Sequence, residues 1–238
     1  MPPEIRLPQV TLSPTPPPAG VEVLLVAGGR KPLIPWLLEA AEGRTVWAVD
    51  RGVDICMEAG LLPALVLGDA DSASKRLLKA AKSRGVEALL VSREKNETDL
   101  QIALRTLVER FYRPSAILTG CWGGRFDHTW SNVMSVVGAL RNGLGFAAMV
   151  DHRELLTVVR GGGAMTLSHG KAPCAVSLLA LSERCSGVSI SGVHWPLERT
   201  LLEKDVPYAI SNRACDGMPT CSRLEEGDLG LYVSWWER

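Results

Sequence analysis

The chain has 238 residues, of which 46% are hydrophobic and 22% are charged, so it can form one large or two small globular domains with a substantial core. Its 26 basic and 26 acidic residues cancel to a formal net charge of +0, which argues against nucleic acid as a partner because duplex-binding proteins carry a basic excess. Since no apolar run reaches the roughly 18 residues of a membrane-spanning helix, we also expect no membrane partner.

The N-terminal segment is rich in proline: seven of residues 1–20 are Pro. It has no basic start followed by an apolar stretch, so its composition does not predict a signal peptide. We therefore expect residues 1–20 to form a flexible arm.

The cysteines show no Cys-x-x-Cys pair, and the histidines have no ligand spacing with them. Because nothing in the sequence points to secretion, the pattern favours buried free thiols in a reducing compartment over disulfides. We expect a cytoplasmic protein.

Residues 21–150 alternate between short apolar runs and amphipathic stretches. The apolar runs are Val21–Val26, Thr45–Val49, Ala64–Leu67, Val86–Val91, Ser115–Leu118 and Phe146–Val150. The helical stretches are Leu33–Glu42, Ala73–Ser83, Leu100–Phe111 and Thr129–Leu140. Continuous apolar strands that alternate with helices predict an α/β fold, with a mostly parallel sheet flanked by helices on both faces.

The pattern changes after Asp151. Residues 151–238 contain short β-prone runs separated by turn residues, and no amphipathic helix is evident among them. This spacing predicts a C-terminal antiparallel β-sandwich domain.

Acidic side chains follow several of the predicted parallel strands. Asp50-Arg51 ends one strand, Asp69 and Asp71 follow the next, and Asp99 follows Thr98, a predicted helix N-cap. Ligands of parallel sheets bind at the carboxyl ends of strands, and paired carboxylates suit Mg²⁺ that bridges to phosphates. A surface ion pair, an Asp-rich turn and an ordinary helix cap are the structural alternatives for these segments.

The strand at Ser115–Leu118 leads into a glycine-rich segment that ends in Gly123-Gly124-Arg125-Phe126-Asp127-His128. Paired glycines let backbone N–H groups approach an anion, and a helix is predicted just beyond them. Arg125 is then placed to bind phosphate with two donors, and Asp127 or Thr129 to cap the helix. The alternative is a glycine turn with an ordinary cap.

Several other catalytic classes lack their signatures here. The sequence contains no Gly-x-x-x-x-Gly-Lys-Ser/Thr loop, no Gly-x-Gly-x-x-Gly fingerprint and no Gly-x-Ser-x-Gly elbow. The candidate groups are carboxylates and arginines, which position phosphates and metal ions.

Taken in order, these segments resemble the thiamine pyrophosphokinase family. The matching motifs are Gly28-Gly29, Asp50-Arg51-Gly52, Gly68 to Ser72, Thr98-Asp99, Gly123 to His128, Gly192 to Leu197 and Ser211-Asn212. They extend over nearly the whole chain past residue 21.

The resemblance implies an enzyme that transfers diphosphate from ATP to the hydroxyl of thiamine, giving thiamine diphosphate and AMP. It implies a homodimer with active sites where subunits meet. On this basis, Mg²⁺ is bound by Asp50, Asp69, Asp71 and Asp99; ATP is contacted by Gly28, Asp50, Arg51, Gly123, Gly124 and Arg125; and thiamine is contacted by Trp195, Ser211 and Asn212. The catalytic set is Asp71, Asp99, Arg125 and Asp127.

The sequence departs from the family pattern at two places. Glu94 and Asn96 stand where Asp is frequent, and Ala209-Ile210 replace a small polar pair before Ser211. Two alternatives therefore stay open: a diphosphokinase for another small alcohol, such as a hydroxymethylpterin, and a protein that binds thiamine diphosphate or nucleotide without turnover.

Overall fold

A computed structural model describes residues 3–69, 73–92 and 96–236 of the chain. The chain divides into two compact units. We call residues 20–151 the α/β unit, and residues 1–19 together with 152–238 the β unit.

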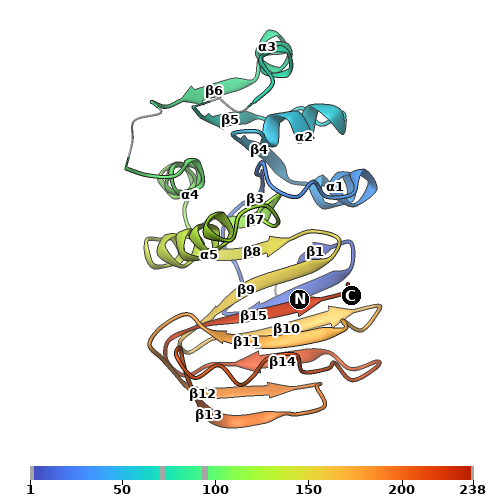
Figure 1. Ribbon diagram of the computed structural model, residues 1–238, viewed down its shortest axis with the longest axis vertical. Helices are drawn as coiled ribbons and strands as arrows, with labels where there is room; N and C mark the ends of the chain where they lie inside the picture. The colour runs from blue at the N-terminus through green and yellow to red at the C-terminus, as the bar shows by residue number, and fades with distance from the viewer. Residues whose placement is uncertain (1–2, 70–72, 93–95, 237–238) are drawn as a thin grey trace. The chain divides into compact units, whose positions relative to one another are not determined.

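Parallel strands form the centre of the α/β unit (Figure 1). They are β3 (Glu22–Val26), β4 (Thr45–Val49), β5 (Leu65–Gly68), β6 (Glu87–Leu90), β7 (Ser115–Thr119) and β8 (Phe146–Val150). The helices are α1 (Ile34–Ala41), α2 (Gly52–Glu58), α3 (Lys75–Ser83), α4 (Asp99–Arg110) and α5 (Phe126–Arg141). Strand pairings give the order β8-β7-β3-β4-β5-β6, with every pair parallel.

Helices cover both faces of this sheet. Figure 1 shows α1, α2 and α3 on one side and α4 and α5 on the other. Strands β7 and β8 are consequently buried along their whole length, which explains why their sequences are continuous apolar runs rather than alternating ones. The predicted α/β class with a mostly parallel sheet is confirmed.

The chain reverses its direction across the sheet between β3 and β7. It runs outward from β3 through β4 and β5 to β6, and α4 then returns it to β7 on the other side of β3. In open parallel sheets the crevice at such a reversal is the usual place for a ligand. The topology therefore predicts a ligand site at the carboxyl ends of β3 and β7.

Thr98 caps helix α4, as predicted. Its side chain accepts a hydrogen bond from the backbone N–H of Gln101, and the Gln101 side chain accepts one from the Thr98 N–H. This reciprocal pair satisfies two N–H groups that the helix itself leaves without partners. The cap also places Asp99 in the first turn, where the helix dipole favours a negative charge.

Thr98→Ala is expected to lower the free energy of unfolding by about 1 kcal/mol. Urea denaturation at equilibrium measures this change. Thr98→Ser keeps the hydroxyl and is the matched control, expected to stay within about 0.5 kcal/mol of the unchanged protein. Equal losses in the two variants would contradict a capping role for the hydroxyl.

The β unit consists of antiparallel strands. They are β1 (Ile5–Leu7), β2 (Val10–Thr15), β9 (Glu154–Arg160), β10 (Ala164–His169), β11 (Ala175–Ala180), β12 (Arg184–Ser191), β13 (Leu197–Glu203), β14 (Thr220–Arg223) and β15 (Asp228–Ser234). One sheet has the strand order β1-β2-β10-β14-β12-β13. Elsewhere in the unit, β15 pairs with both β11 and β9. The predicted antiparallel C-terminal part of the fold class is confirmed.

The prediction of a flexible arm over residues 1–20 is wrong for residues 5–15. These residues form β1 and β2, and β2 pairs with β10 from Thr15 opposite Ala164 to Val10 opposite His169. Ile5 and Leu12 are fully buried, so the segment contributes to the core of the β unit. Hydrophobic burial of roughly 1.5–3 kcal/mol for each such side chain outweighs the turn preference of the neighbouring prolines.

No helix in the described part of the chain is long and apolar enough to cross a membrane. All six cysteines lie within the described residues, and each is free.

Candidate active site at the carboxyl edge of the parallel sheet

Two glycine-containing segments meet where the sheet reverses its order. We call them the β3 loop (residues 27–30) and the β7 loop (residues 120–125). The Gly29 N–H donates to the Gly120 carbonyl at 2.7 Å, and the Arg30 N–H donates to the Trp122 carbonyl at 2.5 Å. The two loops are thus joined through their backbones.

Glycine is required for this close approach. Gly120 has a φ of +68°, and a Cβ there would lie 2.1 Å from the Ala27 carbonyl oxygen. A Cβ at Gly29 would lie 2.5 Å from the Gly120 oxygen. Both distances are shorter than any real contact of a Cβ atom, so larger residues at either position would force the loops apart.

The segment after β4 packs closely against the end of β3 and the β3 loop. A Cβ on Gly52 would lie 1.7 Å from the Val26 carbonyl oxygen, and one on Gly28 would lie 2.7 Å from the Cβ of Arg51. Arg51 itself is exposed at the start of α2. The structure therefore brings the predicted ATP-contacting residues Gly28 and Arg51 side by side.

Asp50 directly follows β4 and has an unusual backbone conformation. Its φ is +52°, a left-handed conformation that Asp and Asn adopt more readily than most other residues. Its N–H donates to the Leu67 carbonyl at 2.7 Å, and its Cα would be 3.2 Å from a Cβ added to Gly68. Asp50 is thereby fixed against the strand end that leads into Asp69.

Arg125 and Asp127 form an exposed ion pair at the start of α5. Arg125 Nε donates to Asp127 Oδ1 at 3.1 Å, and a second, shorter bond joins Arg125 Nη2 to Asp127 Oδ2. The hydrogen bond from Arg125 lowers the pKa of the Asp127 carboxyl, with a smaller contribution from the His128 N–H. A carboxylate whose pKa is lowered is a weaker base, so this geometry favours an orienting role over proton acceptance.

The helix cap at this point differs from the prediction. Arg125 occupies the N-cap position and makes no side-chain capping bond, whereas Asp127 is the second residue of α5. Neither Asp127 nor Thr129 is therefore the N-cap residue.

The predicted metal ligands come from separate strand ends. Asp50 follows β4, Asp69 follows β5, and Asp99 begins α4 after β6. Asp71 lies outside the described residues. Within residues 3–69, 73–92 and 96–236, no three His, Cys, Asp or Glu side chains form a group that could hold a metal ion, so Mg²⁺ binding stays a prediction.

The sequence did not predict an ion pair beside the β7 loop in which the carboxylate is buried and the guanidinium side chain is 23% exposed. Arg30 Nε donates to Asp151 Oδ2 at 2.7 Å, and Nη2 of Arg30 lies 2.6 Å from the same oxygen. The Asp151 side chain is fully buried and follows β8, so the rule that selected the other strand ends could also have selected it. Burial raises the pKa of the nearby Cys121 thiol, and the negative charge of Asp151 raises it further.

Two further polar residues hold loops at this edge. Both carboxylate oxygens of Asp54 accept hydrogen bonds from the Ser74 N–H, at 3.1 and 3.0 Å, which anchors the start of α3 to α2. Asn132 Nδ2 donates to the Cys121 carbonyl at 3.1 Å and ties the β7 loop to α5. No motif in the sequence marks either residue.

The residues predicted to contact thiamine gather in the β unit. The Trp195 N–H donates to Asn212 Oδ1 at 3.1 Å, and Asn212 Nδ2 donates to the Trp195 carbonyl at 2.7 Å. Ser211, with a φ of +60°, precedes Asn212. Trp195 is 57% exposed, so it does not fill the core, and the Arg213 guanidinium lies 5.6 Å from its ring centroid.

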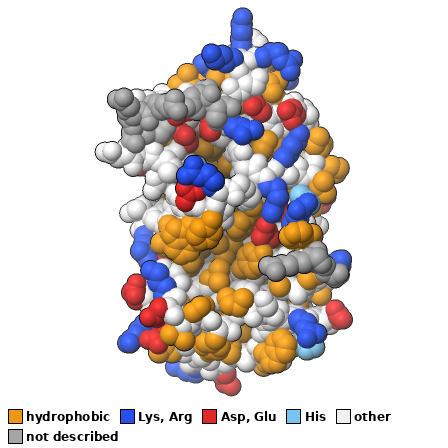
Figure 2. Space-filling view, in the orientation of Figure 1, with side chains coloured by type: hydrophobic (Ala, Val, Ile, Leu, Met, Phe, Trp, Pro, Cys, Tyr) orange, Lys and Arg blue, Asp and Glu red, His pale blue; other side chains and the backbone are white. Residues whose placement is uncertain are grey.

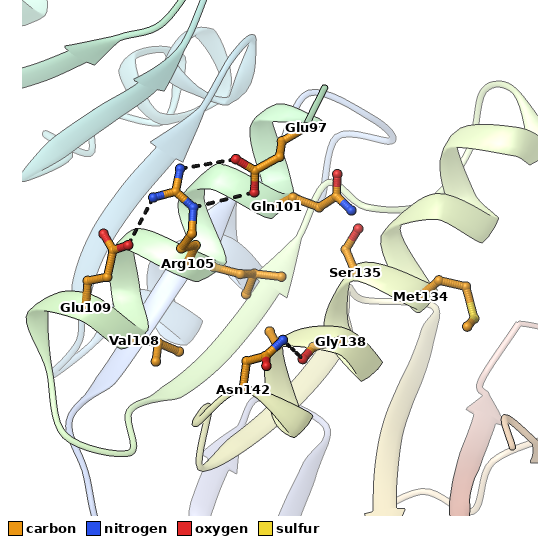
Figure 3. Close-up of a pocket in the computed structure, with 11 residues that line it drawn as sticks. Glu97, Gln101, Arg105, Val108, Glu109, Met134, Ser135, Gly138 and Asn142 are labelled. Atoms are coloured by element: carbon orange, nitrogen blue, oxygen red, sulfur yellow. Dashed lines mark hydrogen bonds and ion pairs between the residues drawn. The ribbon is translucent and has the colours of Figure 1, made fainter. Parts of the chain in front are cut away.

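A separate groove lies between α4 and α5, away from the strand-end loops (Figure 3). Its lining includes Leu104, Met134 and Arg105. The Arg105 side chain bonds to Glu97 and to Glu109 (Figure 3). Arg105 is thus already paired with two carboxylates, which offset its charge toward a phosphate.

Comparisons with known proteins agree with the motifs. Residues 38–146 match the family model for the thiamin pyrophosphokinase catalytic domain. The chain is similar to the thiamine pyrophosphokinase of Bacillus subtilis (strain 168), with 26% identity over 200 residues that cover 83% of this chain and 92% of the relative.

Solved structures show the same fold. The thiamine pyrophosphokinase from Bacillus subtilis gives a TM-score of 0.78 at 21% identity and covers 91% of this chain and 100% of its own. That from Geobacillus thermodenitrificans gives a TM-score of 0.75 at 25% identity, covering 90% of this chain and 97% of its own.

The matched segment contains the Asp50, Asp69 and Asp99 strand ends and the whole β7 loop. Residues 38–146 thus correspond to a thiamin pyrophosphokinase catalytic domain, and the predicted resemblance of this chain to an enzyme of that family is confirmed.

Proposed function

We propose that this chain transfers a diphosphate group from ATP to the hydroxyl of thiamine, giving thiamine diphosphate and AMP. The observation that carries this proposal is the coincidence of the catalytic-domain match, residues 38–146, with the strand ends that hold the acidic and glycine-rich segments. The hydroxyl oxygen attacks the β-phosphorus of ATP, and the bond from that phosphorus to the oxygen that bridges to the α-phosphate breaks. AMP leaves with the bridging oxygen, and the hydroxyl proton passes to solvent.

The donor set at the strand ends fits Mg²⁺. Asp50, Asp69 and Asp99, together with Asp71 outside the described residues, supply carboxylate oxygens, which are the ligands that Mg²⁺ prefers beside substrate phosphates. When bound, the ion supplies positive charge that stabilises the phosphate oxygens during transfer.

The chain's own groups orient and neutralise the phosphates. We propose that the N–H groups of the β7 loop, including those of Gly123 and Gly124, face the phosphates, because glycine at positive φ lets the backbone approach an anion. Arg51 and Arg125 add positive charge, and Asp127 holds the Arg125 guanidinium in place. Positioning and electrostatics carry most of phosphoryl-transfer catalysis, so this scheme needs no strong base.

We propose that thiamine is contacted by Trp195, Ser211 and Asn212. The Trp195 side chain is exposed, and its ring lies beside a cationic group, the Arg213 guanidinium, which supports a cation-binding role for the ring. The thiazolium of thiamine is also a cation, and stacking on a Trp face is favourable by roughly 0.5–2 kcal/mol.

Trp195→Ala is expected to raise the KM for thiamine about tenfold and the KM for ATP less than twofold, because the ring contacts only the acceptor. Steady-state kinetics with each substrate varied in turn measures both constants. Trp236→Ala is the matched control, since Trp236 is also exposed in the β unit and lies under the Arg153 guanidinium at 5.2 Å. Equal effects on the two KM values would show that Trp195 is structural.

The acceptor is tested by measuring AMP release from Mg-ATP with thiamine, and then with a hydroxymethylpterin. We expect release with thiamine and none above background with the pterin. Release with the pterin alone would favour the diphosphokinase alternative, and binding without release would favour the non-catalytic one.

We also propose that the protein acts as a homodimer in the cytoplasm. Large hydrophobic side chains are exposed in the β unit, among them Leu201, Tyr208 and Ile210, and Figure 2 shows hydrophobic side chains gathered over this part of the chain. Sedimentation velocity tests the dimer by its mass.

The free cysteines support a reducing compartment, and cell fractionation tests that location.

A further inference from the structure

The Arg30–Asp151 pair connects three strand ends. Arg30 belongs to the β3 loop and Asp151 follows β8, while the β7 loop lies between them in the sheet order. The Arg30 backbone N–H bonds to the Trp122 carbonyl, and a Cβ on Gly123 would lie 3.0 Å from the Cβ of Arg30. Arg30 thus touches the β7 loop through its backbone and its side-chain base.

The charge of Asp151 also acts on the β7 loop. Its carboxylate is fully buried, and its negative charge contributes to the raised pKa of the Cys121 thiol, after the larger effect of burial. Cys121 follows Gly120 directly, and its carbonyl accepts the bond from Asn132. The loop is therefore held by α5 through Asn132 and by the backbone N–H of Arg30, whose side chain is paired with Asp151.

Stability alone does not account for such a pair. Asp151 is fully buried and the Arg30 side chain is 23% exposed, so pairing them removes most of both charges from water. That removal costs roughly as much as their attraction returns, and apolar residues of similar volume frequently stabilise a core better. A buried pair is better attested as a device that selects one arrangement of the groups around it.

We propose that Arg30 and Asp151 are positioning residues for ATP. They fix the β7 loop against the β3 loop, so that the backbone N–H groups near Gly123 and Gly124 keep the geometry that the ATP phosphates require. This inference rests on the proposed function for the identity of the ligand. We propose that neither residue contacts the reacting atoms.

The test is a double-mutant cycle on ATP binding and turnover. Asp151→Asn is nearly isosteric, and Arg30→Gln replaces the guanidinium by a shorter neutral amide. Both are expected to raise the KM for ATP at least about tenfold and to change the KM for thiamine less than twofold. The double variant is expected to lie within about threefold of the worse single variant, because both changes break the same link. Arg30→Lys, which keeps the charge with fewer donors, is expected to be intermediate and provides a second variant if Arg30→Gln does not fold.

The matched control is the Arg44–Glu22 pair, which lies at the amino ends of β3 and β4 in the same sheet. Arg44 Nε donates to Glu22 Oε2 at 2.8 Å, and the Arg44 side chain is only 7% exposed. Arg44→Gln and Glu22→Gln are expected to lower the urea midpoint without changing the KM for ATP. If they raise that KM as much as the Arg30 and Asp151 variants do, the effect is general destabilisation and the proposal is overturned.

Binding of α,β-methylene-ATP in the presence of Mg²⁺, measured by calorimetry, separates this inference from the proposed function. Failure of the unchanged protein to release AMP with thiamine would reject the function. Failure of Arg30→Gln and Asp151→Asn to weaken binding of the analogue would reject the positioning role. Weakened binding by about tenfold in both variants, together with faster amide hydrogen exchange at Gly29 and Arg30, is the expected result.

Discussion

Asp50→Asn is expected to reduce the rate of AMP formation by about two to three orders of magnitude, while the fold stays intact. The substitution removes the negative charge of one proposed Mg²⁺ ligand and leaves the side-chain volume almost unchanged. The backbone also tolerates it, because Asn accepts the left-handed conformation that Asp50 adopts at φ +52°. An Ala variant would confound the loss of charge with backbone strain.

The measurement is AMP formation as a function of Mg²⁺ concentration. We expect the Mg²⁺ concentration for half-maximal rate to increase in Asp50→Asn, because a ligand of the ion is weakened. Asp205→Asn, at an exposed position of the β unit, is the control and should leave the curve unchanged. Unchanged turnover and unchanged Mg²⁺ dependence in Asp50→Asn would exclude Asp50 from the metal site.

Gly120→Ala is expected to lower the free energy of unfolding by about 3 kcal/mol and to reduce kcat/KM for ATP more than tenfold. The added methyl would lie 2.1 Å from the Ala27 carbonyl oxygen, so the β3 and β7 loops must separate. Separation breaks the bond between the Gly29 N–H and the Gly120 carbonyl and displaces the N–H groups that we propose face the phosphates. Urea denaturation and steady-state kinetics measure the two effects.

Gly43→Ala is the matched control for this loop. Gly43 has nearly the same conformation, with a φ of +71°, but no atom lies within 4 Å of the position of an added Cβ. It therefore reports the cost of the left-handed backbone alone, about 1 kcal/mol, and should leave activity unchanged. If both variants lose the same stability and keep full activity, close packing of the two loops has no part in function.

The α/β unit could be predicted because its local signals agree with its tertiary structure. The run Thr45–Val49 is β4 residue for residue, and the Thr98 cap begins α4 as the sequence indicates. In a parallel sheet covered on both faces, a buried strand is a continuous apolar run, and the sequence displays it directly.

The N-terminal strands could not be predicted in the same way. Proline near Val10–Thr15 is typical of an extended linker, and it hid the alternation of buried and less buried residues in that segment. Pro14 lies in β2 opposite Met165 of β10, a partner 151 positions along the chain. Only that distant pairing reveals the strand.

The same difference between local and distant signals separates the site residues that the sequence predicts from those that it does not. Asp50, Asp69 and the β7 loop were found because each follows a strand directly, and the carboxyl ends of parallel strands share one edge. Arg30 and Asp151 were missed because their bond joins residues 121 positions apart and no motif encodes it. Applying the strand-end rule to β8 would have identified Asp151, but not its partner.

The most direct test of the proposed reaction uses ATP labelled at the β-phosphate, with Mg²⁺ and thiamine. The account predicts that the label enters thiamine diphosphate, that AMP is unlabelled, and that the two products form in equal amounts. Formation of labelled ADP with thiamine monophosphate would show that the γ-phosphate alone is transferred and would contradict attack at the β-phosphorus.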